Sequence, residues 1–231
     1  MKRPVILCAA LCLTAGLLLG GILPMPWDRP AVVTVTSETI IHAPDGSQPQ
    51  SSSALTAPEP LNSKDNFPLL NTACAVVRAL EEEDYATLAA FVHPDRGVTF
   101  TPYSTVDFEV DHRFTRDQIK ALAGDKTVYT WGVVDGRGSL IELTMEQYFA
   151  RYVFDADYTQ APQIGVDQIL MSGNALENLT EAYPGCRFVD FCFPGLDPAY
   201  EGMDWRSLKL VFAPGEVSWL LVGIVHGEWT I

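Results

Sequence analysis

Residues 208–225 of the 231-residue chain read LKLVFAPGEVSWLLVGIV, and the rest of the fold can be arranged around them. Pro214-Gly215-Glu216 separates two β-prone runs, Leu208–Ala213 and Val217–Val225, which predicts a β-hairpin. The second run is apolar on both of its alternating faces. We therefore expect a central strand that is covered by protein on both sides.

The sequence before this hairpin alternates helical and β-prone segments. Apolar residues recur at helical spacing from Leu69 to Leu80, and the capping-box pairs Thr115/Gln118 and Thr144/Gln147 mark two further helix starts. Helices are expected over residues 68–83, 85–92, 115–124, 144–154 and 177–183, and strands over 98–103, 127–134, 164–171 and 187–193. This order predicts an α+β fold, in which N-terminal helices pack on a curved, mostly antiparallel sheet.

Three regions of different composition divide the chain. Lys2 and Arg3 precede an uncharged, apolar run, so residues 1–27 are expected to be a targeting helix, either a cleaved signal peptide or a membrane anchor. Residues 28–65 are Ser/Pro-rich and are expected to be a flexible linker. Residues 66–231 are expected to form a single α+β domain, and the basic start of the chain places that domain outside the cytoplasm.

Charge and cysteine content exclude several classes of function. The chain carries 29 acidic and 15 basic residues, for a formal charge of −14, which argues against nucleic-acid binding because phosphate contacts need Lys and Arg. Cys74, Cys186 and Cys192 lie outside the apolar N-terminal run, and no CxxC or Cys/His cluster occurs. We predict buried free thiols, no metal and no cofactor.

Two groups of residues are candidates for a functional site. The first is a His/carboxylate set that could perform acid–base catalysis, made up of His226 and Glu228 at a strand end, His93 and Asp95 in a proline turn, and Asp111-His112. The second is an acidic and aromatic loop that could bind a ligand, with Asp197, Tyr200, Glu201, Asp204 and Trp205. Each group also has a purely structural interpretation. For the first group it is a histidine that stabilises a turn, and for the second it is an ordered surface loop that covers the sheet.

The order of elements is similar to the cone-shaped fold of the nuclear-transport-factor-two-like superfamily, in which helices pack on a bent sheet around a pocket. Separately, residues 92–103, 129–132, 193–205 and 221–231 resemble a family of uncharacterised exported or lipoprotein-type bacterial proteins. That resemblance implies an extracytoplasmic location and carries no activity with it. A lipoprotein cysteine is usual in some relatives and does not occur in the expected context here.

These observations favour a non-enzymatic module of the cell envelope, which is tethered by its N-terminal segment to the membrane and binds a ligand or protein partner. The alternative is a hydrolase or isomerase that uses His226, Glu228 and His93 in a pocket. A third possibility is a domain that stabilises a larger complex and binds no ligand. The sequence names neither the ligand nor the partner.

Overall fold

The computed structural model describes residues 66–230. The predicted targeting segment, residues 1–27, and the predicted linker, residues 28–65, lie outside the described residues. Within the described part, no helix combines the length and apolar character that a membrane crossing requires.

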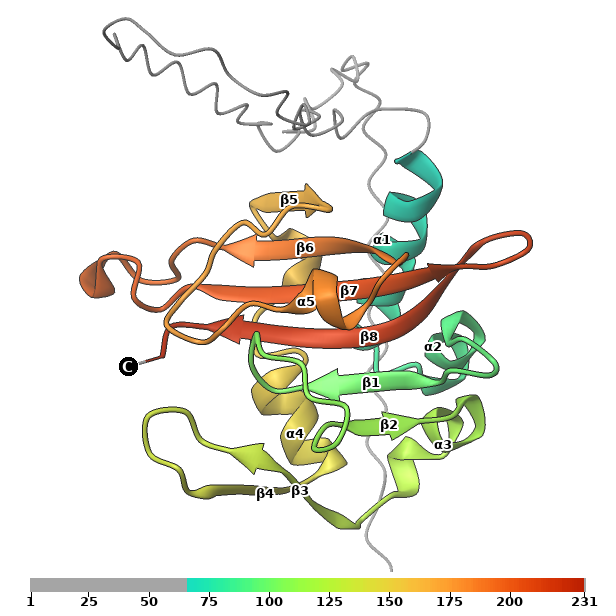
Figure 1. The fold of residues 1–231 in the computed structure, drawn as a ribbon, viewed down its shortest axis with the longest axis horizontal. Coiled ribbons are helices and arrows are strands. Elements are labelled where there is room, and N and C mark those ends of the chain that lie inside the picture. Colours follow the sequence, from blue (N-terminus) through green and yellow to red (C-terminus); the bar gives the residue numbers. More distant parts are fainter. Residues whose placement is uncertain (1–65, 231) are drawn as a thin grey trace, which may run out of the picture. The chain divides into compact units, whose positions relative to one another are not determined.

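A six-stranded sheet forms the centre of the domain (Figure 1). In spatial order its strands are β2 (His112–Phe114), β1 (Val98–Thr101), β8 (Trp219–Glu228), β7 (Arg206–Pro214), β6 (Arg187–Phe193) and β5 (Gln163–Val166). Strands β1 and β8 are parallel, and the other four neighbouring pairs are antiparallel. The predicted α+β class is confirmed, with a mixed sheet.

The hairpin of β7 and β8 occupies the position expected from its sequence. Strand β8 pairs with β7 on one side and with β1 on the other, and residues 221–228 are all buried. Leu221 and Ile224 of β8 belong to one apolar core, while Val222 and Val225 of the same strand belong to a second. The prediction of a strand covered on both sides is confirmed.

Helices cover both faces of this sheet. The helices are α1 (Phe67–Glu81), α2 (Tyr85–Phe91), α3 (Arg116–Lys120), α4 (Met145–Tyr152) and α5 (Leu179–Ala182), with short 3₁₀ turns η1 (Leu122–Gly124), η2 (Tyr158–Gln160) and η3 (Pro198–Tyr200). Helices α1 and α4 pack on the face of the larger core, and α5 lies on the opposite face (Figure 1). The predicted helix starts at Thr115 and Thr144 have complete capping boxes.

A separate two-stranded sheet of β3 (Val128–Val133) and β4 (Leu140–Thr144) lies beyond the edge strand β2. Its inner face contributes Trp131, which stacks on Tyr148 of α4 with ring centroids 3.7 Å apart. Phe100 of β1 and Phe114 of β2 complete this aromatic cluster. Aromatic rings therefore fill the space between the helices and this end of the main sheet.

Several predictions of local structure were wrong. Strands β2 and β4 were not predicted, because β2 has three residues and β4 ends at Thr144, which also caps α4. Strand β5 stops at Val166 instead of continuing to 171, since the next residue, Asp167, has a φ of 51°. The described cysteines are free thiols, but Cys74 is exposed and Cys186 half-buried, so the prediction of burial holds only for Cys192.

Candidate functional site

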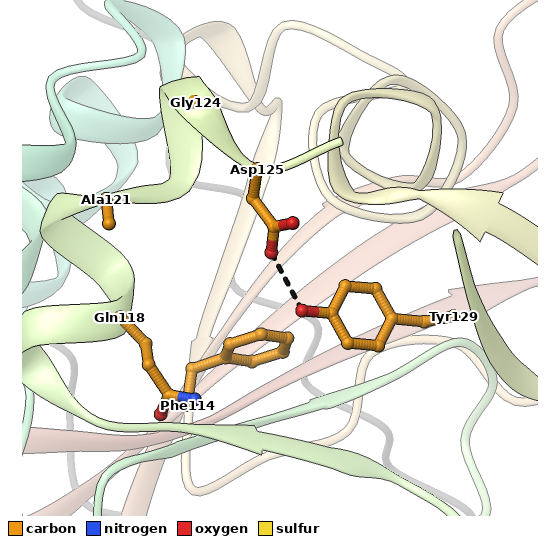
Figure 2. Close-up of a pocket in the computed structure, with 6 residues that line it drawn as sticks. All are labelled: Phe114, Gln118, Ala121, Gly124, Asp125 and Tyr129. Carbon is orange, nitrogen blue, oxygen red and sulfur yellow. Dashed lines mark hydrogen bonds between the residues drawn. The ribbon is translucent and has the colours of Figure 1, made fainter. Parts of the chain in front are cut away.

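An open pocket lies at the rim of the aromatic cluster and is formed by one continuous segment, residues 114–129. It has a volume of ≈ 410 Å³. The segment runs from the end of β2 through α3 and η1 to the start of β3, and so turns back on itself around the opening. The lining residues are Phe114, Gln118, Ala121, Gly124, Asp125 and Tyr129 (Figure 2).

Local hydrogen bonds hold the walls of this pocket. The side chain of Gln118 accepts the Thr115 amide at 2.8 Å, as part of the capping box that starts α3. The ring of Tyr129 packs edge-on against Phe114, with centroids 5.7 Å apart. Gly124 has no heavy atom within 4 Å of the position a Cβ would take, so the space beside it is open.

Asp125 is the one acidic residue among those that line the pocket. Its Oδ1 accepts the Thr127 amide at 2.9 Å, and its Oδ2 accepts the Tyr129 hydroxyl at 2.7 Å (Figure 2). Both bonds lower the pKa of Asp125, and the bond from the Thr127 backbone has the larger effect. The carboxylate is therefore ionised at neutral pH, and each oxygen retains lone-pair capacity for a further donor.

The structure brings His226 and Glu228 together in a second, buried cluster at the end of β8. His226 Nε2 lies 3.1 Å from Asp155 Oδ2, which also accepts Arg206 Nε at 2.8 Å. Glu228 accepts Arg151 at 2.6 Å and lies 3.6 Å from Arg206. This cluster joins the strands β7 and β8 to the segment that follows α4.

The geometry of this cluster leaves little room for acid–base chemistry. The imidazole of His226 is fully buried, and its Nδ1 lies 3.1 Å from the Pro102 carbonyl oxygen. Both ring nitrogens therefore face acceptors, and neither is directed at open space. Burial by itself raises the pKa of Asp155, but the hydrogen bonds and charges of His226, Tyr158 and Arg206 outweigh it and lower the pKa.

Asp155, His226 and Glu228 have potential metal-ligand atoms within 4.8 Å of one another. The donor set does not fit a cation well, because the guanidinium groups of Arg206 and Arg151 already bind both carboxylates. A metal ion there would meet two positive charges that have no other acidic partner in the cluster. We assign the cluster a structural role.

The remaining histidine candidates lie elsewhere. His93 donates its backbone amide to the Leu221 carbonyl oxygen, and its Nδ1 accepts the amides of Asp95 and Arg96 in the proline turn. Leu221 precedes His226 by five residues on β8, or about 16 Å at the usual rise of a strand. His93 is therefore separated from His226 and Glu228.

Asp111 and His112 make their hydrogen bonds to groups other than His226. Asp111 Oδ2 accepts both the Thr101 hydroxyl at 2.7 Å and the Asp107 amide at 3.0 Å. Burial raises the pKa of this carboxyl to about 6, against the lowering effect of both bonds. His112 Nε2 lies 2.9 Å from the carbonyl oxygen of Thr130 on β3, which links the edge of the main sheet to the small sheet.

The acidic and aromatic loop does not present its five candidate residues as one surface. Trp205 is buried, with its ring close to Gly227 and Gly173. Asp204 accepts the backbone amide of Asp197 at 2.7 Å, and Asp197 in turn caps η3. The exposed members are Asp197, Tyr200 and Glu201, while Asp204 is half-buried. The loop thus uses most of its acidic groups to fix its own backbone.

A further buried polar cluster lies on the face covered by α5. The ammonium group of Lys209 is fully buried, 3.0 Å from Glu177 Oε2 and 3.4 Å from Ser104 Oγ. Asp190, opposite Lys209 in the sheet, accepts the Leu170 amide and the Ser207 hydroxyl. Burial raises the pKa of Asp190, and the charge of Lys209 opposes that effect. This cluster ties the loops that cover the sheet to its central strands.

Sequence reasoning did not find the pocket of residues 114–129. The sequence pattern predicts a capping role for Gln118, a helix end at Gly124 and a strand at Tyr129, and it indicates no site at these residues. The only local signal is a short capped helix followed by Asp125, with the aromatic residues Phe114 before it and Tyr129 after it. That pattern is too common to distinguish a pocket from an ordinary connection.

The domain thus belongs to the α+β class, with a curved mixed sheet that carries helices on both faces. No family model matches the chain, and no curated protein matches it. The expected membership of an exported lipoprotein-type family is therefore not supported.

Solved structures do resemble it. One is a putative calcium/calmodulin dependent protein kinase II association domain from Xanthomonas campestris, with 11% identity and a TM-score of 0.30 over 74% of this chain and 92% of that one. Another is a domain of unknown function with a cystatin-like fold from Nostoc punctiforme, with 11% identity and a TM-score of 0.33 over 74% of this chain and 81% of that one. We draw nothing about binding or activity from either likeness.

Proposed function

We propose that the domain is a non-enzymatic binding module that holds a small ligand in the pocket of residues 114–129. The observation that carries the proposal is the pocket itself, with a volume of ≈ 410 Å³, aromatic walls and a single ionised carboxylate. Ligand sites are typically cavities of about 300–1,000 Å³ with apolar walls and a few convergent polar groups. The predicted tether would place this module outside the cytoplasm and near a membrane.

The geometry does not favour the enzymatic alternative. A general base must lie within hydrogen-bond reach of a substrate proton, and both nitrogens of the buried His226 are directed at protein acceptors. Glu228 is bound by arginine, and His93 lies at the far end of β8. Neither the pocket of residues 114–129 nor a second pocket beside α5 includes Asp155, His226 or Glu228.

The test uses a variant that fills the pocket. Gly124→Leu enlarges a residue that lines the pocket, and no heavy atom lies within 4 Å of the new Cβ, so we expect it to narrow the pocket and leave the fold intact. Ala123→Leu is the matched control, because Ala123 is exposed on the same turn and does not line the pocket. Ligand-observed NMR with the full chain would measure binding of a panel of small aromatic alcohols and amines.

We expect the wild-type chain and Ala123→Leu to bind members of the panel, and Gly124→Leu to lose that binding. Equal binding by all three chains would place the ligand outside this pocket and overturn the proposal. Failure of the whole panel to bind the wild-type chain would also count against it, because the panel spans the apolar and polar chemistry of the walls.

A further inference from the structure

If the pocket of residues 114–129 binds a ligand, as proposed above, its lining residues determine which charge and polarity that ligand should have. Phe114, Tyr129 and Ala121 offer apolar and aromatic surface, and Asp125 offers a negative charge at one end. An aromatic ring beside a carboxylate, as Tyr129 lies beside Asp125, offers a cation both charge pairing and aromatic contact. A ligand anion would meet repulsion from Asp125.

The carboxylate of Asp125 has no cationic partner among the described residues. The nearby lysines are paired elsewhere, Lys126 with Glu146 at 3.0 Å and Lys120 with Asp117 at 3.4 Å. Its two oxygens accept from neutral donors, the Thr127 amide and the Tyr129 hydroxyl, which hold the group in place and leave its charge uncompensated.

The charge of the whole chain acts in the same direction. With a formal charge of −14, the protein attracts cations and repels anions before contact. Local and overall charge are therefore both complementary to a positively charged ligand.

We propose that this pocket binds a small organic amine, with its ammonium group on the Asp125 carboxylate and its apolar body against Phe114 and Tyr129. The ammonium donates to the Asp125 carboxylate, which also holds the Tyr129 ring beside it through the hydroxyl bond (Figure 2). Gln118 and the backbone of the α3–η1 turn bound the opposite side.

Two probes of the same shape separate charge from fit. Binding of 2-phenylethylamine and of 2-phenylethanol to the full chain would be measured by titration calorimetry in low salt. An exposed charge pair contributes up to about 1 kcal/mol, so we expect the amine to bind up to about fivefold more tightly than the alcohol. Asp125→Asn should abolish that preference and leave the alcohol unchanged.

A measurement on the wild-type chain keeps the proposal testable if Asp125→Asn does not fold. Raising the sodium chloride concentration should weaken binding of the amine and leave that of the alcohol unchanged, because salt screens the charge pair at a partly exposed site. A matched control, Asp117→Asn, removes an exposed carboxylate of α3 that does not line the pocket, and should change neither affinity.

The outcomes distinguish this inference from the binding function on which it rests. If Gly124→Leu blocks both probes but the alcohol binds as well as the amine, the pocket is a ligand site and the amine assignment is wrong. If Gly124→Leu blocks neither, the pocket is not the site and both proposals fail. Equal affinity for N-acetyl-lysine-methylamide and for 2-phenylethylamine would assign the pocket to a peptide side chain and overturn the small-amine assignment.

Discussion

Removing the buried charge of Lys209 should destabilise the domain strongly. In Lys209→Met the side chain keeps nearly the same length and loses its ammonium group, which is fully buried and lies 3.0 Å from Glu177 Oε2. At that distance the attraction is about 5 kcal/mol for an effective dielectric constant of about 20, before any cost of desolvation. Breaking a buried ion pair by removing one partner costs about 3–5 kcal/mol, because the other charge remains without compensation.

We expect the lower end of that range, about 3 kcal/mol, because Glu177 is still 15% exposed and can turn toward water, and because Asp190, whose pKa is already raised by burial, can bind a proton. For a domain of this size the melting temperature should fall by about 6–12 °C. Urea unfolding of the full chain at pH 7, followed by tryptophan fluorescence, would measure the change in the free energy of unfolding. Glu177→Gln and the double variant complete a double-mutant cycle, in which we expect a coupling energy of about 2 kcal/mol.

The matched control is Lys120→Met, which removes a lysine from an exposed ion pair with Asp117. Exposed pairs contribute about 0–1 kcal/mol, so this variant should change stability little. The reasoning is refuted if Lys209→Met costs no more than Lys120→Met, or if the effects of Lys209→Met and Glu177→Gln simply add. Either result would mean that the pair is not formed in solution.

Three further predictions concern other buried groups. Burial raises the pKa of Asp111 to about 6, so the folded domain is destabilised as the pH rises from about 4 through 6 and this carboxyl loses its proton. Asp111→Asn should therefore be more stable than wild type by roughly 1–3 kcal/mol at pH 8. Urea unfolding at several pH values should show this difference in the free energy of unfolding disappear below about pH 4. Asp155 has a lowered pKa, so the opposite sign applies: Asp155→Asn should lose about 3 kcal/mol at pH 7, and its difference from wild type should narrow as the pH falls below about 4. Gly223→Ala would place a Cβ 2.6 Å from the Tyr183 hydroxyl oxygen and should lower the free energy of unfolding by about 1–3 kcal/mol. Adding Tyr183→Phe should restore only part of that loss, because the ring carbon Cζ remains 2.8 Å from the new Cβ. A melting temperature of Gly223→Ala equal to that of wild type would contradict this packing.

Local sequence patterns determined the elements whose signals lie within a few residues. Thr115 with Gln118 and Thr144 with Gln147 specify helix starts, because a capping box satisfies backbone donors that are close in the chain. The apolar run of β8 specified a central strand, because only burial on both faces accommodates apolar side chains on both. Short strands such as β2 escaped the same reasoning, because three residues carry no readable period.

The tertiary structure alone decided which side chains meet. Sequence spacing correctly grouped His226 with Glu228, which lie two residues apart on the same face of one strand. It could not show that Asp155 contacts His226 or that Arg206 pairs with both Asp155 and Glu228. It could not separate His93, because the place where a turn joins the sheet depends on strand pairing across more than a hundred residues. The open pocket at Asp125 likewise exists only because η1 and β3 turn back toward Phe114, and folding of the chain around a shared core fixes that turn.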